Sequence, residues 1–144
     1  MRIVLCTGCF DPLHVGHLHH LERAAKHGSY LVAAVTSDEQ VTKQKGDGRP
    51  VFCSDERAEM LRALRIVCRV IIVDSLIQAL YQVDPDVLAL GAEYKDRVEA
   101  QHKAFCDLHK IDIVFTDGPV YSSTKLLSHY RRRQWPMVMG SSSR

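Results

Sequence analysis

Five short apolar runs, separated by segments with helical spacing, constrain the fold of this chain more than any other feature of its sequence. The runs are rich in Val, Ile and Leu, and polar residues do not alternate with apolar ones along them. Strands with that pattern are buried on both faces, which is typical of a parallel sheet covered by helices. The predicted strands are residues 3–7, 30–36, 69–73, 86–90 and 111–116.

Apolar residues at spacings of three and four predict helices between these strands, over residues 18–25, 54–64, 76–80, 98–108 and 122–130. The alternation predicts a three-layer, Rossmann-like α/β fold with a mainly parallel sheet of about five strands. In such folds ligands bind at the carboxyl ends of the strands, near the point where the strand order reverses. Two polar, Gly-rich stretches, residues 42–50 and 91–97, are predicted loops near that edge. Residues 1–134 are expected to form one domain, and residues 135–144 a flexible C-terminal tail.

Composition narrows the class of partner. The chain has 144 residues, and 19 Lys and Arg against 17 Asp and Glu give a net charge of only +2. A nucleic-acid-binding surface requires a larger basic excess, so no nucleic-acid partner is expected. No apolar run has the length of a membrane span or of a signal-peptide core, and the five scattered cysteines are typical of reduced thiols. We therefore expect a cytoplasmic protein without a membrane partner.

The segment that joins the first predicted strand to the first predicted helix carries the clearest chemical signal. It reads Thr7-Gly8-Cys9-Phe10-Asp11-Pro12-Leu13-His14-Val15-Gly16-His17. A helix N-terminus offers free backbone N–H groups and a partial positive charge, and Gly16 permits the close approach of a ligand. Two imidazoles three residues apart can both donate to one phosphate chain. The junction therefore predicts an anion-binding site.

The sequence His14-Val15-Gly16-His17 resembles the HxGH motif of the cytidylyltransferase-like nucleotidyltransferases. Further stretches are similar to the heptose-1-phosphate adenylyltransferases of that superfamily, and the similarity covers residues 1 to about 131. These stretches are Lys45-Gly46-Asp47-Gly48-Arg49-Pro50-Val51, Glu56-Arg57-Ala58-Glu59-Met60-Leu61, Pro85-Asp86-Val87-Leu88-Ala89-Leu90-Gly91-Ala92-Glu93-Tyr94 and Tyr121-Ser122-Ser123-Thr124.

The resemblance implies transfer of a nucleoside monophosphate from an NTP, with ATP preferred, to a sugar phosphate such as heptose 1-phosphate, with release of pyrophosphate. It implies catalytic roles for His14, His17 and Lys45, and Mg²⁺ bound mainly through the NTP phosphates rather than by a protein metal site. Asp11 and Arg57 are the expected substrate-binding residues. The expected nucleotide-binding residues are Thr7, Gly8, Cys9, Phe10, Gly16, Arg49, Gly91, Glu93, Tyr121, Ser122, Ser123 and Thr124.

Other functions stay open on the sequence. Glycerol-3-phosphate cytidylyltransferases, which use CTP, carry an Arg-Thr-x-Gly stretch. This chain has Thr116-Asp117-Gly118-Pro119 at the equivalent place, without the arginine, and this difference weakens the case for that activity. FMN adenylylation is a third enzymatic option, and a non-catalytic nucleotide-binding regulatory module is possible on the same fold. The sugar-kinase domain often fused ahead of the heptose enzyme is absent from the sequence, so a stand-alone transferase is expected. A homodimer is left open.

Cys6 and Cys9 form a Cys-x-x-Cys pair, and His14 and His19 follow at a spacing found in zinc sites. A redox pair or a structural zinc site is therefore an alternative. Because Cys6 is predicted to lie in a buried strand and a zinc site would consume His14, we favour free thiols. His19 and His20 are predicted to lie on the surface of the helix.

Overall fold

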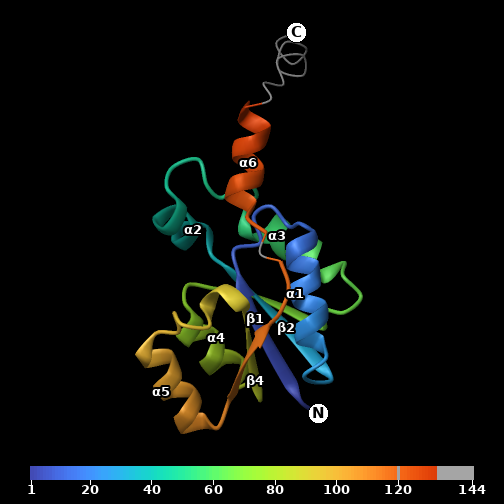
Figure 1. The fold of residues 1–144 in the computed structure, drawn as a ribbon, viewed down its shortest axis with the longest axis vertical. Helices are drawn as coiled ribbons and strands as arrows, with labels where there is room; N and C mark the ends of the chain where they lie inside the picture. Colours follow the sequence, from blue (N-terminus) through green and yellow to red (C-terminus); the bar gives the residue numbers. More distant parts are fainter. Residues whose placement is uncertain (120, 133–144) are drawn as a thin grey trace.

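The computed structural model describes residues 1–119 and 121–132 and contains a sheet of five parallel strands between two layers of helices (Figure 1). The strands are β1 (Ile3–Gly8), β2 (Tyr30–Thr36), β3 (Arg69–Val73), β4 (Val87–Gly91) and β5 (Asp112–Thr116). Each begins and ends within one residue of its predicted bounds. The predicted Rossmann-like α/β class is thereby confirmed.

The strand order is β3-β2-β1-β4-β5, so the chain moves from β1 to one edge of the sheet and then returns to fill the other. The order in which the chain adds strands reverses between β1 and β4. These two strands are parallel neighbours, and Cys6 of β1 pairs with Ala89 of β4. Loops that follow two such strands diverge to opposite faces and leave a crevice at their carboxyl ends. The topology therefore places a ligand site beyond the ends of β1 and β4.

Two helical layers bury the sheet. Helices α1 (Val15–Ala25) and α3 (Ser54–Arg62) cover one face, and α4 (Leu76–Val83) and α5 (Ala100–His109) cover the other (Figure 1). Successive residues of β1 point to opposite faces of the sheet. Val4 packs toward α1 and α3, and Leu5 packs toward α4 and α5. Both strand faces are apolar for this reason, as the non-alternating sequence pattern predicts.

Three further elements frame the carboxyl edge: α2 (Asp38–Lys45), the short 3₁₀-helix η1 (Ala92–Tyr94) and α6 (Ser123–Arg132). In Figure 1, α6 extends away from the sheet beyond this edge. The predicted tail, residues 135–144, lies outside the described residues.

Helix α2 corrects the prediction of a loop over residues 42–50, since its last turn occupies residues 42–45. Val41 is its one buried residue, so no apolar stripe marks this helix in the sequence. Charge stabilises it instead: acidic residues lie in its first turn and basic residues in its last, as the helix dipole favours. Lys43 also forms an ion pair with Glu39, one turn before it, at 2.8 Å.

Candidate active site

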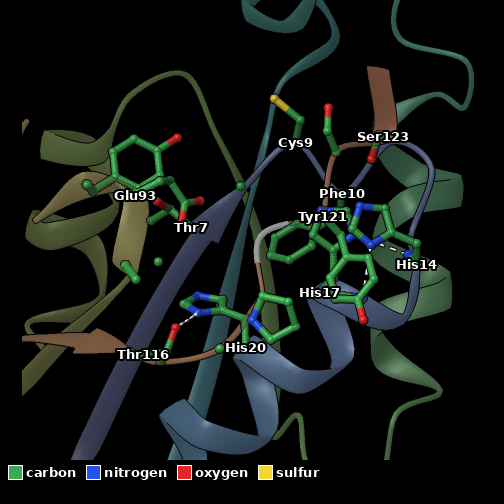
Figure 2. A pocket seen from close by; sticks show the side chains of 18 of the residues that line it. Thr7, Cys9, Phe10, His14, His17, His20, Glu93, Thr116, Tyr121 and Ser123 are labelled. Atoms are coloured by element: carbon green, nitrogen blue, oxygen red, sulfur yellow. Dashed lines mark hydrogen bonds between the residues drawn. The ribbon is translucent and has the colours of Figure 1, made fainter. Parts of the chain in front are cut away.

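A cavity of about 370 Å³ opens at the carboxyl edge of the sheet, where three strands end (Figure 2). Gly8, Gly91 and Thr116, the last residues of β1, β4 and β5, all line it. The N-terminus of α1 also borders the cavity, with Gly16 in its wall. The cavity thus lies at the reversal of strand order, where folds of this kind bind ligands.

Most of the predicted site residues come together around this cavity, although they belong to separate segments of the chain. The predicted residues that line it are Thr7, Gly8, Cys9, Phe10, Asp11, His14, Gly16, His17, Lys45, Gly91, Glu93, Tyr121, Ser122 and Ser123. Their convergence follows from the topology, because the carboxyl ends of parallel strands share one edge of the sheet.

Arg49, Arg57 and Thr124 are predicted site residues that do not line the cavity. The buried guanidinium of Arg49 donates to Asp11 Oδ2 at 3.0 Å and to the Asp11 carbonyl at 2.6 Å. A third hydrogen bond, of 3.2 Å, joins Arg49 to Thr124 Oγ1. Arg49 thus contacts both Asp11 and Thr124, and neither Arg49 nor Thr124 lines the cavity.

Asp11 is buried, and its carboxylate organises the loop that precedes α3. Its oxygens accept hydrogen bonds from the backbone N–H of Val51 at 2.8 Å and of Phe52 at 2.9 Å. Burial alone would raise the pKa of Asp11, but these two hydrogen bonds and the Arg49 guanidinium lower it below its ordinary value. Asp11 is thus an ionised anchor for residues 49–52, rather than a carboxylate free to bind substrate.

Arg57 has no exposed side-chain surface and forms hydrogen bonds with four residues. Its Nη1 donates to the carbonyls of Cys9 and Thr36, each at 2.7 Å. Its Nε donates to the Phe52 carbonyl at 2.9 Å, and its Nη2 pairs with Asp38 Oδ1 at 2.7 Å. Because every guanidinium nitrogen already has a protein acceptor, the structure assigns Arg57 to positioning the Cys9 turn and not to substrate contact.

His14 and His17 form the N-terminal cap of α1 with their own rings. His14 Nδ1 accepts from the Gly16 N–H at 3.1 Å, and His17 Nδ1 accepts from the His14 N–H at 3.2 Å. The two imidazoles stack with centroids 3.8 Å apart. Since each Nδ1 is an acceptor, each neutral ring carries its proton on Nε2. His14 Nε2 is buried without a hydrogen-bond partner in the described part of the chain.

Both rings are held in the neutral form. Burial lowers the pKa of His17 to about 3, and the nearby His14, His20 and Lys45 contribute to this shift. The pKa of His14 is also lowered, by burial first and by the charge of Lys45 second. The pair therefore presents two N–H donors at neutral pH without a fixed positive charge, while Lys45 supplies the charge from the end of α2.

We expect stability to fall on acidification because of this pair. Unfolded His17 takes up a proton below pH 6.5, whereas the folded side chain does so only near pH 3. Between these two values the unfolded state binds more protons than the folded state. The free energy of unfolding therefore decreases as the pH is lowered, by up to about 1.4 kcal/mol per pH unit for this residue. Urea denaturation between about pH 4.5 and about pH 6.5 measures the slope, above the range in which Asp11 titrates. His17→Asn should flatten it, and an equal slope in both proteins would contradict the assignment.

Tyr121 packs directly over the first turn of α1. A Cβ at Gly16 would lie 2.5 Å from Tyr121 Cβ, so no larger residue fits there. Ser123 Oγ donates to the Pro12 carbonyl at 3.1 Å, and this hydrogen bond fixes the start of α6 against the same turn. Two helix N-termini therefore meet at one side of the cavity, as the sequence motifs predict.

Several cavity residues were not among the predicted site residues. They are His20, Arg23, Gln44, Thr116, Asp117, Gly118 and Pro119, whereas Ala92 and Tyr94 line the cavity as part of the loop 91–94, which the resemblance places beside the base. The prediction that His20 lies on the helix surface is wrong: the ring lines the cavity, and its Nδ1 lies 2.6 Å from Thr116 Oγ1. Its spacing of three from His17 placed it on the same helical face, a signal present in the sequence.

The cysteines do not support the zinc alternative. Cys6 is completely buried in β1, and burial raises the pKa of its thiol to about 12. Cys9 is half-buried at the cavity, with its Sγ 3.8 Å from Gln44 Oε1. Within residues 1–119 and 121–132, no three His, Cys, Asp or Glu side chains are grouped as a metal site.

The Rossmann-like sheet, with a cavity at its switch point and paired histidines capping the adjoining helix, defines a nucleotidyltransferase-like domain. The sequence agrees: the cytidylyltransferase-like family matches residues 5–131, and the chain belongs to that family. The resemblance stated from the motifs is confirmed. No helix in the described part of the chain has the length and apolar content needed to cross a membrane.

Relatives place the chain more narrowly. Bifunctional protein HldE from Desulfatibacillum aliphaticivorans is 36% identical over 135 residues, which cover 90% of this chain and 27% of that protein. HldE from Koribacter versatilis is 43% identical over 95 residues, 65% of this chain and 20% of that protein. The chain thus spans roughly a quarter of the length of the HldE proteins that it matches over most of its residues.

Solved structures share the fold. A lipopolysaccharide core biosynthesis protein from Thermoplasma volcanium superposes with a TM-score of 0.67 at 28% identity, covering 85% of this chain and 99% of that one. Pantothenate synthetase from Thermus thermophilus superposes with a TM-score of 0.61 at 14% identity, over 81% of this chain and 55% of that one. The second similarity concerns the fold alone.

Proposed function

We propose that this domain transfers a nucleoside monophosphate from an NTP, preferably ATP, to a sugar phosphate such as heptose 1-phosphate and releases pyrophosphate. The similarity to HldE and the motifs shared with heptose-1-phosphate adenylyltransferases support this choice of acceptor. The cavity supports the reaction class, because its α1 side gathers hydrogen-bond donors suited to a polyphosphate.

The observation that carries the proposal is the orientation of two neutral imidazoles. In both His14 and His17, Nδ1 accepts a hydrogen bond from a backbone N–H, and Nε2–H is left as a donor beside the cavity. The buried Nε2 of His14 has no hydrogen-bond partner among the described residues, which is costly unless a ligand satisfies it. A phosphate oxygen is a suitable acceptor, and charge-assisted hydrogen bonds of that kind are the stronger ones.

The residues would act by positioning and by stabilising charge. The acceptor's phosphate oxygen attacks the α-phosphorus in line, the bond from that phosphorus to the bridging oxygen breaks, and pyrophosphate leaves with the bonding electrons. His14 and His17 would donate to oxygens that gain charge in this step, and Lys45 would neutralise the phosphate chain. No side chain has to form a covalent intermediate, which suits a site built from donors.

Magnesium would be held mainly by the nucleotide. The described residues contain no grouped metal ligands, and the carboxylates at the cavity, Glu93 and Asp117, follow β4 and β5 rather than the α1 N-terminus. This donor set fits an ion coordinated chiefly by phosphate oxygens and water. When bound, Mg²⁺ would neutralise phosphate charge while the protein supplies the oriented donors.

A substrate matrix tests the proposal. ATP, CTP and GTP are each combined with heptose 1-phosphate, glycerol 3-phosphate and FMN, with Mg²⁺ present, and pyrophosphate release is measured. We expect the highest kcat/KM with ATP and heptose 1-phosphate. Turnover of CTP with glycerol 3-phosphate alone would replace the substrates but keep the reaction class. Tight NTP binding with no pyrophosphate from any pair would overturn the proposal in favour of a regulatory module.

A further inference from the structure

Three histidines of α1 and its N-cap, His14, His17 and His20, recur at every third residue and all line the cavity. The first two accept at Nδ1 and therefore carry their protons on Nε2. The third is hydrogen-bonded differently: its Nδ1 faces the side chain of Thr116, at the end of β5 (Figure 2). The tautomer of His20 thus depends on which group receives the hydrogen bond from the Thr116 hydroxyl, His20 Nδ1 or another acceptor.

The Thr116 hydroxyl donates to the Leu90 carbonyl at 3.4 Å, across the β4–β5 pair. The 2.6 Å contact between His20 Nδ1 and Thr116 Oγ1 fits either tautomer, but if the hydroxyl proton is used at Leu90, Thr116 Oγ1 can only accept and His20 Nδ1 carries the proton. The neutral ring of His20 then has a bare Nε2, which acts as an acceptor. One helix face therefore presents two donors, at His14 and His17, followed by one acceptor.

The surroundings of His20 differ from those of the phosphate-binding end. Glu93 follows β4, and Asp117 follows β5, so two carboxylates line this part of the cavity against the single guanidinium of Arg23. Burial lowers the pKa of His20, and although the Glu93 charge opposes this effect the net shift is downward, so the ring is neutral at pH 7. An anionic acceptor phosphate would be repelled here, whereas a neutral group that bears N–H donors would be attracted.

We propose that His20 Nε2 accepts a hydrogen bond from the exocyclic amino group of the nucleobase, and that Thr116 fixes His20 in the tautomer that permits it. The inference rests on the proposed function and adds a specificity rule to it. Bases with an amino group, adenine and cytosine, are accepted, and bases with a carbonyl at the same position are disfavoured. Pro119 and Tyr94 also line the cavity and offer ring surfaces to a planar base.

Matched nucleotide pairs test this rule, because ATP and ITP differ at the 6-position, as CTP and UTP do at the 4-position, by amino against carbonyl. Dissociation constants are measured by calorimetry with α,β-methylene analogues of all four, without acceptor. We expect roughly fivefold tighter binding of the amino member of the preferred pair, the usual value of one satisfied hydrogen bond. His20→Leu should reduce that ratio to about twofold or less. His27→Leu, at an exposed position beyond α1, should leave it unchanged.

Substitution of Thr116 separates tautomer control from simple contact. Thr116→Ser keeps the hydroxyl and should keep the amino preference. Thr116→Val removes the acceptor for His20 Nδ1–H and should abolish the preference while His20 stays in place. Long-range ¹H–¹⁵N NMR spectra report the tautomer directly: His20 should be protonated on Nδ1 in the wild-type protein, opposite to His14 and His17.

The outcomes distinguish this inference from the proposed function. An ATP-to-ITP ratio that is equal in the wild-type protein and His20→Leu would overturn the inference, even if pyrophosphate release is normal. An Nε2-protonated His20 would also overturn it, as would a His20→Leu variant that changes the KM of the acceptor but not the ratio. Conversely, absence of pyrophosphate release with an intact amino preference would refute the enzymatic function and retain the assignment of His20.

Discussion

His17→Asn is expected to lower the rate of pyrophosphate release by about 10²- to 10³-fold, the cost of removing one oriented donor from a site of developing charge. The asparagine Oδ1 occupies the place of Nδ1 and can still accept from the His14 N–H, so the helix cap is retained. What the substitution removes is Nε2–H and the ring that stacks on His14 at 3.8 Å. The measurement is single-turnover pyrophosphate release with saturating NTP and acceptor.

The design separates catalysis from folding. Circular dichroism and the melting temperature should stay close to those of the wild-type protein, because the cap hydrogen bond survives. His27→Asn is the matched control, since it makes the same exchange at an exposed position after α1 and should retain full activity. If His17→Asn releases pyrophosphate at the wild-type rate, His17 has no part in charge stabilisation.

The sheet could be predicted from sequence because burial on both faces makes nearly every residue of the inner strands β1, β2 and β4 apolar. The buried run from Leu31 to Val35 has no polar position at all, and such runs were found to within one residue. Helix α2 was missed because it buries Val41 alone and depends on charge complementarity, which has no helical period. Patterns therefore predicted elements that pack into the core and failed for one that lies at its edge.

The cavity could be predicted in part, for a related reason. Motif position brought His14, His17 and Lys45 to one edge, since parallel topology decides where strand ends and helix starts lie. The direction of a long side chain depends on hydrogen-bond acceptors that are distant in the sequence. The residues next to an arginine in the sequence do not indicate which acceptors these are. Arg49 and Arg57 look like cations for phosphate in the sequence, yet both are used by backbone carbonyls brought close only in the folded protein.

Arg57→Met is expected to destabilise the protein by about 3–5 kcal/mol, the range for breaking a buried charged network. The substitution removes all five N–H donors of a side chain with no exposed surface. It leaves the carbonyls of Cys9, Thr36 and Phe52 without the donor that joins them. Each unsatisfied buried acceptor costs about 1–3 kcal/mol, partly recovered where water enters. Urea denaturation at pH 7 measures the loss.

Arg62→Met is the matched control, because Arg62 is exposed in the last turn of the same helix and should lose less than about 1 kcal/mol. Arg57→Lys should recover little, since an ammonium on a flexible stem cannot reproduce the planar set of donors that spans these segments. NTP binding should weaken in both Arg57 variants beyond the effect of unfolding, because the Cys9 turn that lines the cavity loses its support. Equal stability of Arg57→Met and Arg62→Met would mean that the turn is held by Asp11 and Arg49 alone.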